Sequence, residues 1–184
     1  MIRARQILAA TALLSSPALA ASGQSATALG QAEAIIITPI IAVSLNDLDF
    51  GSLTSSRTAS GSVTVGAEGS VNYAGGAAPA CGGACAGVAP ARFLVSGEAG
   101  RSYTVTAPAA ITASGTLIGG GSAPALAIDA LTVHLDSHAG AVTSIGQLDD
   151  KGEDRIEVGG RLNVPAGTAP AHYRATLTIM VTYS

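Results

Sequence analysis

The sequence predicts an all-β protein built as an antiparallel β-sandwich. Most segments are short and alternate apolar with polar residues, the period of a strand with one buried face. Gly, Pro and Ser separate these segments, as turns between neighbouring strands require. No long segment has the 3.6-residue period of an amphipathic helix. With two Phe, four Tyr and no Trp, the core must consist mainly of Val, Ile and Leu, which suit a pleated sheet.

The first residues have the features of a secretory signal peptide. Arg3 and Arg5 form a basic start, residues 7–14 form a short apolar run, and Ala18-Leu19-Ala20 is a small-x-small cleavage site. The run is too short for a membrane anchor, which takes roughly 20 apolar residues. We therefore expect residues 1–20 to be a signal peptide that is removed on export.

The mature chain then divides into a short leader and one domain. Residues 21–33 are small and polar and should be flexible, whereas residues 34–184 suffice for a single β-sandwich domain. No other segment is long and apolar enough to span a bilayer. Without the two arginines of the signal peptide, 9 − 2 = 7 basic residues remain against 12 acidic ones, a net charge of −5. This balance, with Lys151 as the sole lysine, offers no basic patch for nucleic acid.

The predicted strands follow one another along the whole domain. They lie within residues 33–45, 48–53, 60–66, 91–100, 101–108, 126–137, 147–160, 161–167 and 173–183. Pro39 in the first of these argues for an edge strand or a bulge, because proline cannot donate a ladder hydrogen bond. The last segment alternates over eleven residues, which predicts one long terminal strand. Two Gly-rich stretches, 75–87 and 118–124, are expected to be loops.

Cys81 and Cys85 lie in the first of these loops. An exported chain meets an oxidising compartment, and three intervening residues, two of them Gly, let the backbone turn back. We therefore predict a local disulfide that fixes the loop. The C-x-x-x-C spacing without a following helix disfavours a thioredoxin-type redox site, and two thiols without nearby histidines make a poor zinc site.

No motif of catalysis or cofactor binding accompanies these strands. His134, His138 and His172 lack the spacing of a helical zinc site and are expected at the surface or at strand ends. No G-x-S-x-G elbow is present for a Ser-His-Asp hydrolase, although Ser and Asp are plentiful. The acidic turn 149–154 favours a solvated turn, and calcium binding there is left open. We expect no enzyme and no cofactor.

Three blocks carry a resemblance to a known family. They are DLDFG, the hairpin F-x-V-x-G-E-x-G-x-x-Y from Phe93 to Tyr103, and VGG-x-L-x-VPAG, and they occur in the family's order. With these blocks the mature chain resembles the secreted bacterial family catalogued as domain of unknown function 4402. That family is similar to the immunoglobulin-like sandwiches of pilin-like surface subunits, which often have a penultimate Tyr in the terminal strand, here Tyr183. The leader departs from a pilin donor strand, since Leu29 is the one large apolar residue in 21–32.

The resemblance implies an immunoglobulin-like, pilin-like structural or adhesive subunit, secreted to the periplasm or the outer surface of a bacterium. Strand addition would join it to itself, to another envelope subunit or to a periplasmic chaperone. The candidate residues are Ile35, Ile37, Ile41, Val43, Leu177, Ile179, Val181 and Tyr183. The alternative is a monomeric binding module of the envelope, in which loop 75–87 or loop 118–124 would contact a ligand.

Overall fold

A computed structural model describes residues 27–82, 85–138 and 144–184 of the chain. The chain divides into two units, residues 1–35 and residues 36–184. In the first unit, residues 27–35 are exposed and form no strand or helix, while the predicted signal peptide and residues 21–26 lie outside the described part. No helix among the described residues is long and apolar enough to cross a membrane.

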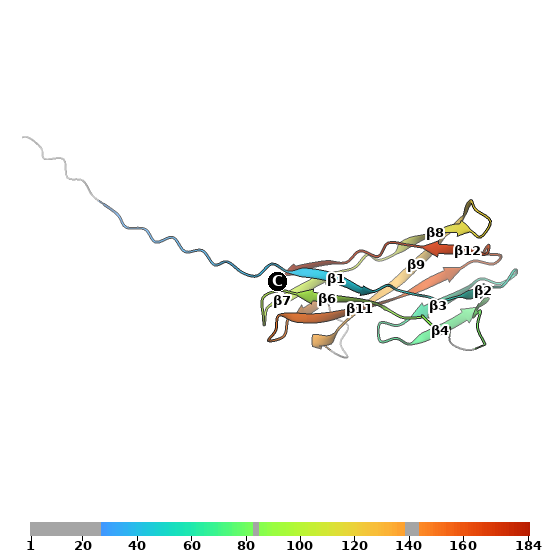
Figure 1. The fold of residues 1–184 in the computed structure, drawn as a ribbon, viewed down its shortest axis with the longest axis horizontal. Helices are drawn as coiled ribbons and strands as arrows, with labels where there is room; N and C mark the ends of the chain where they lie inside the picture. The colour runs from blue at the N-terminus through green and yellow to red at the C-terminus, as the bar shows by residue number, and fades with distance from the viewer. Residues whose placement is uncertain (1–26, 83–84, 139–143) are drawn as a thin grey trace, which may run out of the picture. The chain divides into compact units, whose positions relative to one another are not determined.

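The second unit consists of antiparallel strands, which confirms the predicted all-β, sandwich-like class (Figure 1). The strands are β1 (Ile41–Asn46), β2 (Leu53–Ser55), β3 (Gly61–Val65), β4 (Val71–Gly75), β5 (Ala77–Pro79), β6 (Ala91–Ser96), β7 (Ser102–Thr106), β8 (Ile111–Leu117), β9 (Ser122–Leu135), β10 (Ile145–Gln147), β11 (Glu153–Val164), β12 (Ala171–Arg174) and β13 (Met180–Tyr183). A single 3₁₀ turn, η1 (Asp136–His138), follows β9 in the described chain. The narrower, immunoglobulin-like topology stays a prediction.

One large sheet forms most of the unit. Its strand order is β1-β6-β11-β9-β8-β12, and β3 pairs with the second half of β11 and with β4. A three-stranded sheet, β10-β7-β13, and a two-stranded sheet, β2-β5, complete the unit. The long strands β9 and β11 run through both halves of the large sheet. The first half of β11 pairs with β6 and its second half with β3, while β9 pairs with β8 in its first half and with β11 in its second.

The buried side chains form two clusters, one in each half of the unit. We call the first the closed core: Ala91, Phe93, Val95, Tyr103, Val105, Leu135, Leu148, Ile156 and Val158. We call the second the open core: Phe50, Val63, Val65, Ala77, Ala113, Leu126, Ile128, Leu162 and Val164. Leu48 and Leu131 pack against both clusters and connect them.

The alternating patterns located most strands, and the structure differs from the predictions in several places. Residues 33–40 form no strand, so the first strand begins only at Ile41, two residues after Pro39. The predicted loop 118–124 is largely a tight turn between β8 and β9, where Gly120 and Gly121 adopt positive φ angles. The predicted loop 75–87 contains β5, which pairs with β2.

A further difference concerns the end of the chain, where the sequence pattern predicts one continuous strand over residues 173–183. The structure has two short strands instead, because β12 pairs with β8 of the large sheet whereas β13 pairs with β7 of the three-stranded sheet. A strand that changes sheets must interrupt its ladder where it crosses between them. Residues 175–179 are this interruption.

Candidate functional site: an apolar groove between two sheet edges

A groove of about 1770 Å³ runs between the two ends of the large sheet. One side is lined by residues 46–55 at the end of β1 and beyond, and the other by residues 168–177, which contain β12. Because β1 and β12 stand at opposite ends of the strand order, the sheet must curl until its two edges face each other across the groove. The groove is therefore an open seam between the two edges of the sheet, in the place where one more strand would join them.

Residues of both cores form the floor of this seam. Six residues of the open core line it: Phe50, Ala113, Leu126, Ile128, Leu162 and Val164. Ala91 and Phe93 of β6 add two residues of the closed core. Each of these eight side chains is at most 9% exposed, so further burial of the floor itself can add little. An occupant would gain mainly from its own apolar surface and from the partly buried flank, for example Leu53, Ile111 and Leu177.

The register of β1 explains why this edge leaves the groove open. Ala42 lies opposite Val95 and Ser44 opposite Phe93, both buried, so the small side chains of β1 face inward. Ile41 and Val43 lie opposite Ser96 and Leu94 on the outer face and are 56% and 53% exposed. The face of β1 with the large apolar side chains is therefore the outer face of an edge strand.

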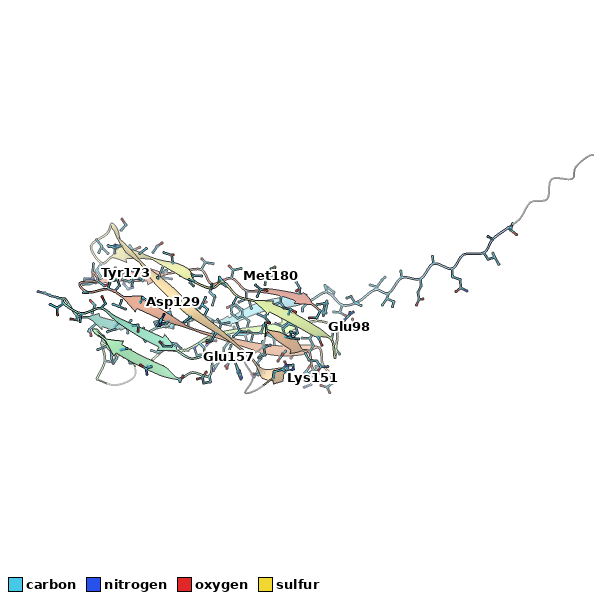
Figure 2. The ribbon with its side chains drawn as sticks, turned by 180° about the vertical axis from the view of Figure 1, so that it is seen from behind. Glu98, Asp129, Lys151, Glu157, Tyr173 and Met180 are labelled. Carbon is cyan, nitrogen blue, oxygen red and sulfur yellow. A yellow bond between two sulfur atoms is a disulfide. The ribbon has the colours of Figure 1, made fainter. Side chains whose placement is uncertain are left out.

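The opposite edge has backbone without a partner. Residues 175–179 make no backbone–backbone hydrogen bond to any described residue, whereas β12 and β13 on either side are paired. Tyr173 and Met180 mark the two ends of this stretch in Figure 2. Leu177 and Ile179 still pack against the closed core, and Leu177 also lines the groove. The segment thus keeps a strand-like alternation of side chains beside a free edge.

Tyr183 fastens the start of the unit to its end. Its hydroxyl donates a hydrogen bond to the Thr38 carbonyl at 2.8 Å and accepts one from the Glu98 amide at 2.6 Å. The Thr38 amide in turn donates to Glu98 Oε2 at 2.8 Å. The Arg101 guanidinium stands 5.1 Å from the centre of the tyrosine ring, in the range of a cation–π contact. A Cβ on Gly97 would collide with the tyrosine hydroxyl, so this approach requires glycine.

The eight strand-addition candidates therefore lie in three settings. Ile35 is exposed in the first unit, and Ile37 is 36% exposed at the start of the second. Ile41 and Val43 lie on the outer face of β1. The C-terminal four, Leu177, Ile179, Val181 and Tyr183, pack against the closed core along the free edge and β13. The groove floor itself was missed, because its residues come from segments far apart in the sequence.

The other sequence-predicted groups have structural roles. Cys81 and Cys85 form the predicted disulfide, with their Cα atoms 5.5 Å apart. In the acidic turn, the Asp149 carboxylate accepts hydrogen bonds from the Lys151 and Glu153 amides, and the Glu153 amide is the main cause that lowers its pKa. Asp154 is buried and accepts hydrogen bonds from Tyr103 and Ser137, so its carboxylate is not exposed beside those of the turn.

Asp154 is the one buried charged side chain of the described residues, and it organises the closed half. Its carboxylate accepts hydrogen bonds from the Tyr103 hydroxyl at 2.7 Å and from the Ser137 hydroxyl at 2.5 Å and amide at 3.1 Å. Burial, and then the bond to Asp154, raise the pKa of Tyr103, which stays a neutral donor. Because these groups are hydrogen-bonded to one another, the network stabilises the structure and presents no acid or base to a substrate.

The model of one protein family matches this chain over residues 41–183, from β1 to the penultimate residue. A search of curated proteins and a search of solved structures each found no match. The matched range contains the whole of the groove and both of its edges. The chain therefore belongs to the family described as Domain of unknown function (DUF4402), as its sequence blocks predicted.

Proposed function

We propose that this protein is an exported, non-enzymatic structural subunit of a bacterial surface fibre that associates by accepting a β-strand in its groove. The observation that carries the proposal is the seam: two edges of one curled sheet line the same apolar groove, and one of them has unpaired backbone. An added strand would supply the hydrogen bonds missing at residues 175–179 and cover the apolar floor at once.

The chain offers a strand for such a partner. Residues 27–37 precede the domain without secondary structure, and Leu29, Ile35 and Ile36 among them are at least 80% exposed. Large apolar side chains on an unpaired segment favour a role in contact with another chain. Glu33 would have to face solvent in the bound strand, which directs the alternate residues Ala32, Ala34 and Ile36 toward the floor.

The side chains that line the groove suit a structural role. The groove is lined mostly by apolar and hydroxyl side chains, with Asp47, Asp49, His172, Tyr173 and Arg174 as its charged or titratable residues. None of these five is hydrogen-bonded to a nucleophilic side chain among the described residues. Strand addition requires of the groove only a matching shape, apolar contact and backbone pairing.

The test is a binding and assembly experiment on the chain from residue 21 onward. Leu177→Asp places a charge in the groove, and Thr178→Asp places the same charge on the exposed neighbouring residue. We expect the unsubstituted chain and Thr178→Asp to bind a labelled peptide of residues 27–38 and to form oligomers in light scattering. Leu177→Asp should do neither.

A second peptide, with Ile35 and Ile36 replaced by Asp, controls for nonspecific binding. If all chains stay monomeric and bind neither peptide, the protein is the monomeric envelope module and the fibre proposal is wrong. If Leu177→Asp assembles as well as Thr178→Asp does, the groove is not the contact.

A further inference from the structure

We propose that His134, Asp136 and Glu157 bind a divalent transition-metal ion of the Zn²⁺ class on the outer face of the large sheet. The potential ligand atoms of these three side chains lie within 4.8 Å of one another. The site is on the opposite face of the sheet from the groove, and it does not depend on the function proposed above.

The fold brings the three ligands together from two strands and a turn. His134 of β9 lies directly opposite Glu157 of β11 in the ladder, and both point outward because Leu135 and Ile156 beside them are buried. Asp136 follows two residues after His134, on the same side. Figure 2 labels Glu157 at this place on β11.

The buried Asp154 network positions the third ligand. Its carboxylate holds both the amide and the hydroxyl of Ser137, the residue after Asp136, and so fixes the turn η1 against β11. Such outer interactions orient metal ligands in known sites. Asp136 is exposed while His134 and Glu157 are partly buried, which leaves one side of the cluster open for water to complete the coordination.

The state of the histidine ring supports a ligand at this point. The Nδ1 atom of His134 is buried and has no hydrogen-bond partner among the described residues, and Glu157 Oε2 lies 3.9 Å from it, too far for a hydrogen bond. Bond lengths to zinc of about 2.0–2.2 Å put ligand atoms roughly 3.4 Å apart, so the three ligand atoms, which lie within 4.8 Å of one another, must draw together around an ion. The other carboxylate oxygen, Oε1, accepts from Arg92 at 2.8 Å and is thereby oriented.

The charges around the cluster favour a cation. Arg92 offsets Glu157, and Arg155 shares the outer face of β11, but Asp136 and the nearby Glu68 leave negative charge beside the ring. Hydrogen bonds from its own amide and from Ser70 lower the pKa of Glu68, and His134 adds a smaller contribution. A nitrogen ligand with two carboxylates selects zinc or a similar ion over calcium, which takes oxygen ligands only.

Equilibrium dialysis and calorimetric titration with Zn²⁺ alone test the site on the mature, disulfide-bonded chain without a purification tag. We expect one ion per chain, and a loss of affinity of about tenfold or more in His134→Gln and in Glu157→Gln. His172→Gln, the same change on the edge strand β12, should bind as the unsubstituted chain does. Ca²⁺ should not compete.

Melting curves without metal establish that each variant is folded, and the long-range ¹H–¹⁵N spectrum of His134 gives a second readout. Its Nδ1 signal should shift on addition of Zn²⁺ while the signals of His172 stay in place. Absence of saturable uptake overturns the site, and so does uptake that His134→Gln and Glu157→Gln leave unchanged.

Discussion

The closed core and the open core are built from the same kinds of residue and differ in what covers them. Over the closed core, β7 of the three-stranded sheet supplies Tyr103 and Val105, and β13 packs Val181 and Tyr183 against it. Over the open core no such third layer lies within the described chain, and the groove reaches six of the core side chains. The two cores thus differ in what covers them, while both have enough apolar residues.

The two halves also differ in how they treat polar groups. The closed half buries Asp154 within a full set of hydrogen bonds, whereas residues 175–179, between β12 and β13, make no backbone–backbone hydrogen bond within the described chain. Unpaired backbone at a sheet edge is a site for another strand. The difference therefore separates a network that stabilises the fold from the segment at which we propose strand addition.

The largest effect should come from removing a leucine of the closed core. Leu135→Ala, at a position with no exposed surface, is expected to lower the free energy of unfolding by about 4–5 kcal/mol, at the upper end of the known range, because the enclosing sheet cannot collapse into the cavity. Leu126→Ala in the open core should cost less, about 2–3 kcal/mol, because the site adjoins the groove and can relax. Urea unfolding of the two variants measures both. Equal losses would mean that the open core is as well enclosed as the closed one.

Most of the strands in both halves could be predicted from the sequence. Which strands pair with one another, and so where the groove lies, could not. Alternation in 60–66 and 91–96 correctly identified β3 and β6, and the acidic turn before Ile156 located the start of β11. Alternation states which residues share a face, but it does not state which strand lies alongside. The alternation at 173–183 is therefore the same whether the segment forms one strand in one sheet or two strands in two sheets.

The candidate sites escaped prediction for a related reason. The groove joins residues 46–55 to residues 168–177, and the cluster of His134, Asp136 and Glu157 depends on the register of two long strands. Neither the groove nor the cluster corresponds to a short motif in the sequence. The terminal Tyr183 was singled out through the family resemblance, and its contacts with Thr38 and Glu98 explain the need for a hydroxyl there.

Removing the Tyr103 hydroxyl should weaken the closed half next. Tyr103→Phe keeps the ring but leaves the buried Asp154 carboxylate with one donor fewer, at an expected cost of about 1–3 kcal/mol. Tyr73, whose buried hydroxyl has no partner within the described chain, provides the control. Tyr73→Phe in the open half should be neutral or stabilising. Chemical denaturation of both variants tests this, and a larger loss from Tyr73→Phe would reverse the assignment.

Tyr183→Phe should have a smaller effect at the end of the closed half, where the chain of the unit begins. The change removes the bonds to Thr38 and Glu98 and keeps the ring under Arg101, so we expect a loss of about 1 kcal/mol. That loss corresponds to a fall of about 2–4 °C in the melting temperature. Hydrogen exchange should accelerate most at residues 36–40. Unchanged exchange there would show that the hydroxyl does not hold the start of the unit.

The turn before β11 makes the stability of the closed half depend on pH in the acid range. Because hydrogen bonds in the folded state lower the pKa of Asp149 below its ordinary 3.8, its carboxylate stabilises the fold above that pH. The contribution must disappear as the pH falls through the folded-state pKa. We therefore expect Asp149→Asn to melt below the unsubstituted protein at pH 7 and to approach it under strong acid. Asp150→Asn, which removes a carboxylate without a hydrogen bond among the described residues, should not show this convergence.

The smallest effect concerns the point where β9 passes from one half to the other. Ala130 has a φ of 47° in the bulge between the pairs Thr132–Gly159 and Asp129–Arg161, and the next residue, Leu131, packs against both cores. An alanine in this conformation is strained by about 1–2 kcal/mol, and glycine relieves that strain at an entropic cost of about 0.5–1 kcal/mol. Ala130→Gly should therefore raise stability by up to about 1 kcal/mol, and Ala127→Gly on the same strand should lower it. A lower melting temperature for Ala130→Gly would mean that the bulge is not a strained junction and that the two halves are joined elsewhere, through Leu48.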